Sequence, residues 1–255
     1  MDCIVLVKLV ANIENIPSDA WDVETGTLRR GRLHMVANPL DDRALLAARR
    51  LADASGGRVV ALSMGPRSAE AACRRALAYG AHASVLLSDA AFAGADTLAT
   101  ARVLAAAIRR ATREHDLTDP LILAGMQSPD GDTAQVPAAV AALLDLPLLP
   151  YATALDYVAA PEHATALEPV EDGIRVELLR ERGTVRATVA AAPAVVTFTG
   201  LAPSPSFATS LRCMAGAARA RVPRWGARTL GLDPSLTGLA GSATRVVAIR
   251  TVVHG

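Results

Sequence analysis

Aromatic residues are scarce in this chain of 255 residues, where they make up only 3%, although 51% of the residues are hydrophobic. Most of the hydrophobic residues are Ala, Leu and Val. An interior of this composition must depend on aliphatic contacts between helices and sheet. The length allows one large α/β domain with a well-buried core and an arm attached to it.

Neither charge nor hydrophobicity is concentrated in the way that marks a nucleic-acid-binding or membrane protein. The formal net charge is +1, whereas general nucleic-acid binders neutralise phosphates with a basic surface. No apolar stretch approaches the roughly 20 residues that a membrane-spanning helix needs. We therefore expect no nucleic acid among the partners and no membrane insertion.

Cysteine is also rare, and its positions exclude two kinds of site. Cys3, Cys73 and Cys213 are odd in number and far apart in the sequence. This pattern fits a reducing cytoplasm and provides neither a disulfide framework nor the ligand spacing of a metal site. The N-terminus, Met1-Asp2-Cys3, lacks the basic start and the small-residue cleavage site of a signal peptide. We expect a cytoplasmic protein without a bound metal.

Strand and helix patterns alternate four times in the first 150 residues. Helices should begin at Asn38-Pro39, near Ser68, at Asp96 and near Thr133, where caps or turns precede apolar residues at helical spacing. The strands between them are continuous apolar runs, which are typical of parallel strands covered on both faces. These runs are residues 3–7, 58–63, 84–87 and 121–124. The order predicts an α/β fold with a doubly wound parallel sheet and right-handed crossovers.

The sequence pattern changes after residue 150. Turn signals at 171–173 and 181–183 flank alternating segments such as 174–178, which predicts a small antiparallel meander at one edge of the sheet. The apolar run 193–198 should then rejoin the sheet. From Gly200 onward Pro, Ser, Gly and Arg dominate, which indicates an extended arm that a partner surface orders. We therefore divide the chain into an α/β domain, residues 1–200, and a partner-embracing C-terminal arm, residues 201–255.

Ligands of an open parallel sheet bind beyond the carboxyl ends of the strands, where the strand order reverses. Three segments follow strands directly: 8–11, 63–66 and 125–135. In the third, Gly131 permits a tight backbone. The N–H groups from Thr133 to Val136 lie at an expected helix start, where they would favour a phosphate. The 1–200 domain is therefore a candidate nucleotide-binding domain.

Other side chains of this loop suit a nucleotide as well. Thr133 and Gln135 can donate hydrogen bonds, whereas Asp130 and Asp132 would orient the loop or accept from ribose hydroxyls. A polar loop that only caps a helix would look the same, and the sequence has neither GxGxxG nor GxxxxGK[ST]. No nucleophile or general acid–base pair is evident. We expect a protein that holds a cofactor rather than one that catalyses with its own side chains.

Several motifs resemble the beta subunit of electron transfer flavoproteins along most of the chain. Residues 22–28 (DVETGTL) resemble the family's early hairpin, and 38–42 (NPLDD) resemble its NPxD motif. Residues 63–66 (SMGP) are similar to its second-strand exit, 76–81 (ALAYGA) to its ALAMGAD stretch, and 125–136 to its nucleotide loop. The resemblance implies an adenine nucleotide alpha hydrolase-like fold that binds FAD, or AMP in its place.

The resemblance also implies partners and site residues. The partners would be an electron transfer flavoprotein alpha subunit and, beyond it, a flavin dehydrogenase or a ferredoxin- or quinone-type acceptor. The expected cofactor-binding residues are Leu6, Val7, Lys8, Asn38, Asp41, Ser63, Met64, Gly65, Thr97, Gly125, Gln127, Asp130, Gly131, Asp132, Thr133, Ala134, Gln135 and Val136.

Four segments are similar to the electron-bifurcating branch of this family: 87–89, 91–97, 130–136 and 238–242. In that branch the beta subunit holds a second FAD, which divides an electron pair between acceptors of high and low potential. Ordinary members hold AMP in the beta subunit and FAD in the alpha subunit. Membership of the bifurcating branch would make Thr97, at a helix start, an additional flavin contact.

Two interpretations from other classes compete with an electron-transfer subunit. A stand-alone adenine-nucleotide sensor of the universal-stress type would have the same sheet layout, but its GxxGx₉G phosphate pattern is missing and the long arm would be unexplained. An ATP-pyrophosphatase would need an SGGxDS loop after the first strand, which is absent. We rank the electron-transfer subunit first.

Overall fold

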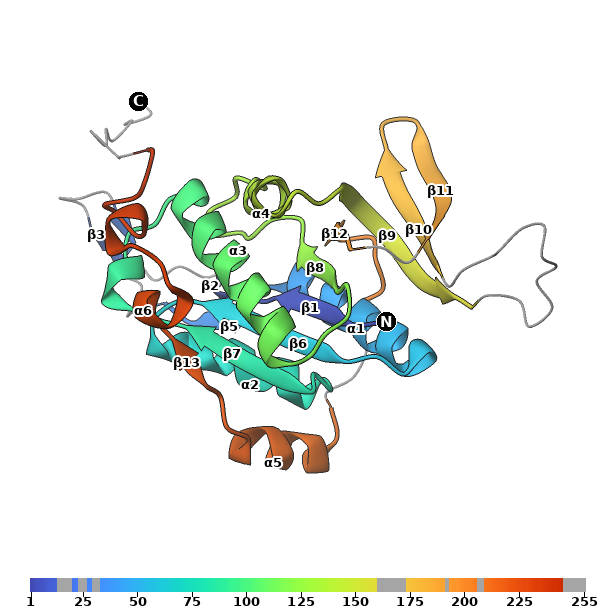
Figure 1. Ribbon diagram of the computed structural model, residues 1–255, viewed down its shortest axis with the longest axis horizontal. Coiled ribbons are helices and arrows are strands. Elements are labelled where there is room, and N and C mark those ends of the chain that lie inside the picture. The colour runs from blue at the N-terminus through green and yellow to red at the C-terminus, as the bar shows by residue number, and fades with distance from the viewer. Residues whose placement is uncertain are drawn as a thin grey trace.

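The computed structural model describes residues 1–12, 20–22, 27–28, 33–159, 173–190, 193–205 and 209–244. A nine-stranded sheet, in the order β11-β10-β9-β12-β8-β1-β6-β7-β13, forms its centre (Figure 1). The strands from β9 to β13 in that order are parallel, and β10 is antiparallel to β9 and β11. The strand bounds are β1 Cys3–Leu6, β6 Val59–Met64, β7 Ala83–Leu87, β8 Leu121–Gly125, β9 Leu148–Val158, β10 Gly173–Arg180, β11 Gly183–Ala190, β12 Val195–Phe198 and β13 Arg224–Trp225. The predicted parallel sheet with an antiparallel meander is confirmed.

Helices cover both faces of this sheet. The main helices are α1 Pro39–Ser55, α2 Glu70–Ala78, α3 Thr97–Glu114 and α4 Val136–Leu144. In β1, Cys3 and Val5 are buried in a cluster with α1 and α2. Ile4 and Leu6 are buried in a second cluster with α3 and α4, and α3 lies in front of the sheet in Figure 1. Both faces of the central strands are therefore apolar, which explains their continuous hydrophobic runs.

The start and end of α1 agree with the sequence. Asn38 accepts a hydrogen bond from the N–H of Leu40, and Pro39 occupies the first helical position. Gly56 ends the helix with a φ of 70°, in the left-handed region that glycine adopts without strain.

Of the two helices on the other face, α3 begins as predicted and α4 does not. Asp96 caps α3 by accepting a hydrogen bond from the N–H of Ala99. The helix expected to start near Thr133 begins at Val136 instead. Asp132 and Ala134 precede this helix and have φ values of 48° and 55°, so they cannot be part of a right-handed helix.

The meander and the returning strand lie where the sequence predicts them. Glu181-Arg182 form the turn between β10 and β11, and Gly183 has a φ of 125°. Residues 171 and 172 of the other predicted turn lie outside the described residues. The strand β12 joins the sheet between β9 and β8.

Two short ribbons precede α1. The pairing of β3 (Trp21–Asp22) with β4 (Thr27–Leu28) confirms the early hairpin at 22–28. The pairing of β2 (Leu9–Ala11) with β5 (Met35–Ala37) was not predicted. Strands of three residues are too short for an alternating pattern to be visible in the sequence.

The described part of the arm lies against the chain's own domain. Its helix α5 (Leu211–Arg219) contacts α2, its strand β13 pairs with β7, and its helix α6 (Ala227–Leu230) contacts α3. These elements were not predicted, because the Pro-, Ser-, Gly- and Arg-rich composition of the arm indicated an extended chain. Short 3₁₀ helices complete the fold at η3 Arg67–Ala69, η4 Ala90–Phe92 and η5 Pro234–Leu236. The partner-embracing role of the arm stays a prediction. In the described ranges, no helix is both long enough and apolar enough to cross a membrane.

Candidate functional site

The strand order reverses next to β1. The chain passes from β1 to β6 and β7 on one side and then crosses to β8 on the other side. The segment after β1 leads towards α1 on one face of the sheet, whereas the segment after β8 leads to α4 on the opposite face. A crevice at the carboxyl ends of β1 and β8 is therefore the expected place for a ligand.

A buried carboxylate joins the ends of these two strands. One oxygen of Asp41, Oδ2, accepts a hydrogen bond from the backbone N–H of Lys8, which follows β1, at 2.8 Å. The other oxygen, Oδ1, accepts from the backbone N–H of Gly125, at the end of β8, at 3.1 Å. Asn38 Nδ2 donates to the same Oδ1 at 2.8 Å. The first turn of α1 thus fixes the two strand ends relative to each other.

The environment of Asp41 has two opposing effects on its proton affinity. Burial raises the pKa of Asp41 to about 8, although the hydrogen bonds from Lys8, Gly125 and Asn38 favour the ionised form. The adjacent Asp42 also raises it. The hydrogen bonds to both oxygens oppose protonation, but burial outweighs them, so the folded chain favours the protonated form below about pH 8.

The junction requires glycine at position 125, because there is no room for a side chain there. A Cβ atom at this position would lie 2.5 Å from Asp41 Oδ1 and 2.7 Å from Leu40 Cβ. Real Cβ atoms do not make such contacts, so the helix N-terminus approaches β8 this closely only because residue 125 is glycine.

The loop after β8 has two further ties to this junction. Asn38 Nδ2 also donates to the carbonyl oxygen of Gln127 at 2.9 Å. Lys8 Nζ lies 2.6 Å from Asp130 Oδ1 and 3.1 Å from Ser128 Oγ. The Asp130 side chain is 8% exposed and that of Lys8 is 41% exposed, so the carboxylate is the more buried partner of this ion pair. The ion pair ties the loop to the segment after β1, and the expected cofactor-binding role of Asp130 stays a prediction.

The rest of the loop is open to solvent and has a different backbone from the one expected. Gly131 is not in the left-handed region, and a Cβ there would meet only Ser128 Oγ at 3.8 Å. The left-handed positions fall instead on Asp132 and Ala134. A left-handed residue other than Gly or Asn is uncommon and often belongs to a functional loop.

The late start of α4 changes which amides lie at the helix start. Pro137 has no N–H group, and the N–H of Ala139 donates to the carbonyl oxygen of Gln135. Val136 and Ala138 therefore provide the amides of the first helical turn, and residues 133–135 lie in the loop before it. Thr133 and Gln135 are exposed, and neither side chain has a hydrogen-bond partner in the part of the chain that is described.

The strand on the other side of β1 contributes an unsatisfied hydroxyl. Ser63, in β6, is fully buried, and its Oγ has no hydrogen-bond partner among the described residues. A buried hydroxyl without a partner costs about 1–3 kcal/mol, so such a group commonly awaits a ligand or a water molecule. Met64 and Gly65 follow it, and the N–H of Gly65 continues the sheet by donating to Leu87 O at 3.0 Å.

Two candidate residues can contribute only through their backbone. The side chains of Leu6 and Val7 are buried in the two hydrophobic clusters on opposite faces of the sheet. Taken with the polar groups around them, the residues present fit an adenine nucleotide, which needs backbone donors, an unsatisfied hydroxyl and a cation near its phosphates.

Thr97 occupies a different part of the same sheet edge. It is the first residue of α3, beyond β7, and no hydrogen bond or ion pair in the described ranges joins it to residues 125–136. Its segment, 91–97, contacts the arm segment 238–242 instead. The N–H of Leu239 donates to Ala93 O at 2.8 Å. Ser242 Oγ accepts from the N–H of Asp96 at 2.9 Å. Two of the segments that resemble the bifurcating branch are thus brought together.

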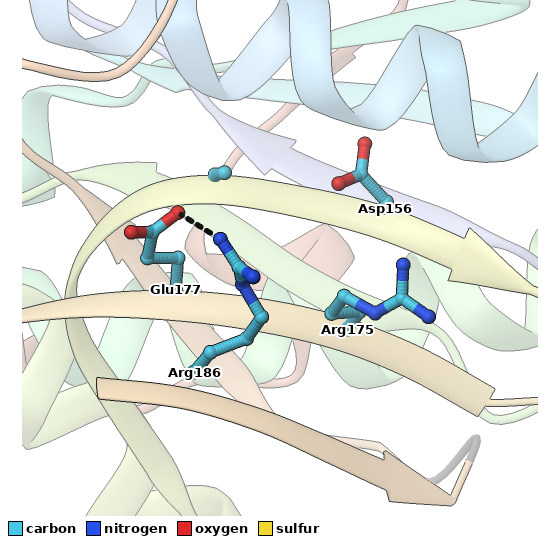
Figure 2. A pocket seen from close by; sticks show the side chains of 5 residues that line it. Asp156, Arg175, Glu177 and Arg186 are labelled. Carbon is cyan, nitrogen blue, oxygen red and sulfur yellow. Dashed lines mark ion pairs between the residues drawn. The ribbon is translucent and has the colours of Figure 1, made fainter. Parts of the chain in front are cut away.

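The sequence argument missed Ser128 and the extent of the Asp41 junction. Ser128 stands in the candidate loop, but only the fold shows that it faces Lys8, which is 120 positions away. A cavity of about 310 Å³ lies elsewhere, on the antiparallel strands (Figure 2). Among the described residues, no group of His, Cys, Asp and Glu could hold a metal ion.

Comparisons with known proteins agree with the motifs. Residues 25–227 match the family described as "Electron transfer flavoprotein domain". The chain is 39% identical over 223 residues to Protein FixA of Bradyrhizobium diazoefficiens, covering 87% of this chain and 73% of the relative. It is 34% identical over 253 residues to the electron transfer flavoprotein subunit beta of Megasphaera elsdenii, covering 98% and 87% of the two chains. Identity to the subunit beta of Clostridium acetobutylicum is 34% over 246 residues, covering 94% and 86%.

Proposed function

Because the chain belongs to the electron transfer flavoprotein family, among its beta-subunit and FixA members, we propose that it holds an adenine nucleotide in the crevice between β1 and β8. The nucleotide is FAD, or AMP in its place. The chain pairs with an alpha subunit in the cytoplasm. The pair carries electrons between a flavin dehydrogenase and a ferredoxin- or quinone-type acceptor.

The observation that carries this proposal is the junction at Asp41. It holds the ends of β1 and β8 and the first turn of α1 in one arrangement, with the loop after β8 tied to it through Asn38 and Lys8. A preformed junction of this kind positions backbone groups for a ligand before the ligand arrives, which lowers the cost of ordering on binding.

Each group has a proposed role. The backbone from Leu6 to Lys8 and from Gly125 to Gln127 would line the crevice, and Ser63 would bond to the bound nucleotide through its hydroxyl. Thr133 and Gln135 would donate to its phosphates, with Val136 N–H, and Lys8 would add a positive charge. FAD would supply one- and two-electron chemistry when bound, whereas AMP would have a structural role. The protein's own residues bind and orient the nucleotide and set its electrostatic surroundings.

The remaining candidates belong to this proposal in a less direct way. Asp41 and Asp130 would hold the junction and the loop after β8 in place rather than contact the ligand, since both are already hydrogen-bonded within the chain. Gly131, Asp132 and Ala134 shape the loop. Thr97 contacts the nucleotide only if the bifurcating form, with FAD in this subunit, is the correct one, because it lies beyond β7.

The test is a double substitution, Thr133→Ala with Gln135→Ala, in the chain co-purified with its alpha subunit. Both side chains are exposed and without described partners, so we expect the free energy of unfolding to change by less than about 0.5 kcal/mol. We expect nucleotide retention to fall about tenfold or more, because two neutral hydrogen bonds to the ligand are removed. The measurement is the ratio of nucleotide to protein after gel filtration.

Thr118→Ala provides the matched control. Thr118 is exposed and lies just before β8, at the amino end of this strand, whereas the candidate site lies at its carboxyl end. Its substitution should leave nucleotide content unchanged. Full retention by the double variant, at unchanged stability, would count against the site.

A further inference from the structure

The strand β11 forms one end of the sheet, and in the described ranges no strand pairs with its outer side. It has eight residues and contains neither Pro nor Lys. Two of its valines, Val185 and Val189, are 52% and 37% exposed. Figure 1 shows the β10–β11 hairpin at the outer end of the sheet, away from the main helices. The opposite end is closed by a strand of only two residues, β13.

An edge of this kind is unusual in a protein that works alone. Its unpaired N–H and C=O groups are a template for another strand, and natural proteins protect such edges with Lys, Pro, short strands or a covering element. The composition of β11 uses none of the first three devices. The edge is therefore suited to a strand that comes from another chain.

The charges on one face of the hairpin indicate what that strand should contain. Figure 2 shows four charged side chains on this face, which line the 310 Å³ cavity: Asp156 from β9, Arg175 and Glu177 from β10, and Arg186 from β11. Arg175 is opposite Asp156, and Glu177 is opposite Arg186. Charges of opposite sign thus alternate across the strands, and the row that reaches the outer edge ends in a positive charge.

That positive charge is only partly neutralised. Arg186 Nη2 lies 3.6 Å from Glu177 Oε2, and its side chain is 69% exposed. A long, exposed ion pair contributes little and leaves the guanidinium able to bind a second carboxylate. On the opposite face, Val185, Ala187 and Val189 stand at alternate positions next to buried residues of β10. A strand added outside β11 would meet apolar side chains on one face and Arg186 on the other.

We propose that β11 is the docking edge for a β-strand of the alpha subunit, in which apolar residues alternate with polar ones and an acidic residue lies opposite Arg186. Backbone hydrogen bonds would hold the strand, and the charge of Arg186 would set its register. This inference rests on the proposed function, because it takes the alpha subunit as the occupant of the edge.

The test uses the full chain co-expressed with its alpha subunit, carrying Val185→Lys and Val189→Lys together. Lysine on an edge strand opposes pairing, and both positions are exposed enough for the fold to tolerate it. We expect heterodimer affinity, measured by titration of the purified subunits, to fall at least tenfold. Arg186→Glu should give a similar loss, whereas Arg186→Lys should retain most of the affinity. Ala142→Lys, at an exposed position of α4, adds the same type of charge away from the edge and should have no effect.

Hydrogen exchange gives the second measurement. On addition of the alpha subunit, the amides of 183–190 should become at least tenfold more protected in the wild type. Wild-type affinity in the double lysine variant, or unchanged exchange of these amides, would overturn the proposal. A homodimer of the chain alone that the lysines abolish would also overturn it, since the edge would then bind a second copy. If the wild-type chain binds no alpha subunit at all, the proposed function itself fails, whereas the outcomes above leave its nucleotide site intact.

Discussion

Among single residues, position 125 must be glycine because the start of α1 approaches the end of β8 so closely. A methyl group there would collide with Asp41 Oδ1 and Leu40 Cβ. We expect Gly125→Ala to lower the free energy of unfolding by about 1–3 kcal/mol, the usual cost of overpacking a tight contact. Urea denaturation measures this change. Gly131→Ala is the control, because a Cβ at 131 has room, and it should change stability by less than about 0.5 kcal/mol.

The titration of Asp41 gives a prediction about pH. Burial raises the pKa of Asp41 to about 8 in the folded chain, from its ordinary value of 3.8. Between these two values the folded state binds more protons than the unfolded state, so this group makes stability fall as pH rises from about 4 to 8. The slope has a limit of about 1.4 kcal/mol per pH unit. Asp41→Asn should remove this part of the pH dependence. If the variant and the wild type keep the same slope over this range, the buried carboxyl does not titrate as described.

The same residues show what could be inferred from sequence at this scale. The motif around Asn38 and Asp41 was identified by resemblance, and the loop after β8 by its place after a buried strand. The fold brings them together. The role of Gly131 was inferred from the general freedom of glycine, but the left-handed positions lie at Asp132 and Ala134. Sequence alone does not show which loop residue takes an unusual backbone conformation, because that depends on the distance the loop must span.

The helix starts were predicted correctly where the sequence has a strong capping residue. Asn38-Pro39 and Asp96 are strong caps, and the helices begin there as predicted. The start of α4 was placed too early because Thr133 looks like a suitable first residue while the two left-handed residues near it are invisible in the sequence. The arm elements were missed because the composition of the arm indicated an extended chain, whereas contacts with α2, β7 and α3 hold its helices and strand in place.

The last described residue of the arm, Thr244, is held by a carboxylate with two functions. Asp96 accepts from the N–H of Ala99, which caps α3, and its other oxygen accepts from the N–H and hydroxyl of Thr244. Burial acts to raise the pKa of Asp96, but the hydrogen bonds from Ala99 and Thr244 outweigh it and hold the pKa below its usual value. The arm contact is therefore present at neutral pH and is lost as pH falls through this lowered pKa.

Asp96→Asn should separate the two functions. The amide keeps an oxygen for the cap but presents a donor towards Thr244, so the end of the arm should loosen while helix content stays constant. We expect the Thr244 amide to exchange several-fold faster, corresponding to the loss of a hydrogen bond worth about 1 kcal/mol. Circular dichroism and hydrogen exchange check both parts. Asp233→Asn, in a carboxylate that accepts from Ser235 within its own turn, is the control. Unchanged exchange at Thr244 would show that Asp96 does not hold the arm.

At the scale of the whole molecule, the chain has a closed core but incomplete edges. The sheet is covered on both faces, and its β7 end is closed by the arm, whereas the β11 end is open in the described ranges. The candidate nucleotide site and this edge lie on different strands, so the binding of a nucleotide and of a partner chain can be tested separately. The function we propose requires both.

The most direct test of the central claim is to identify the ligand released from the wild-type chain co-purified with its alpha subunit, by absorbance and mass spectrometry. We predict one adenine nucleotide per copy of this chain, in addition to the FAD of the partner. Two FAD per heterodimer would indicate the bifurcating form, and one FAD with one AMP would indicate a structural nucleotide in this subunit. A heterodimer that releases no nucleotide beyond the partner's single FAD would contradict the account.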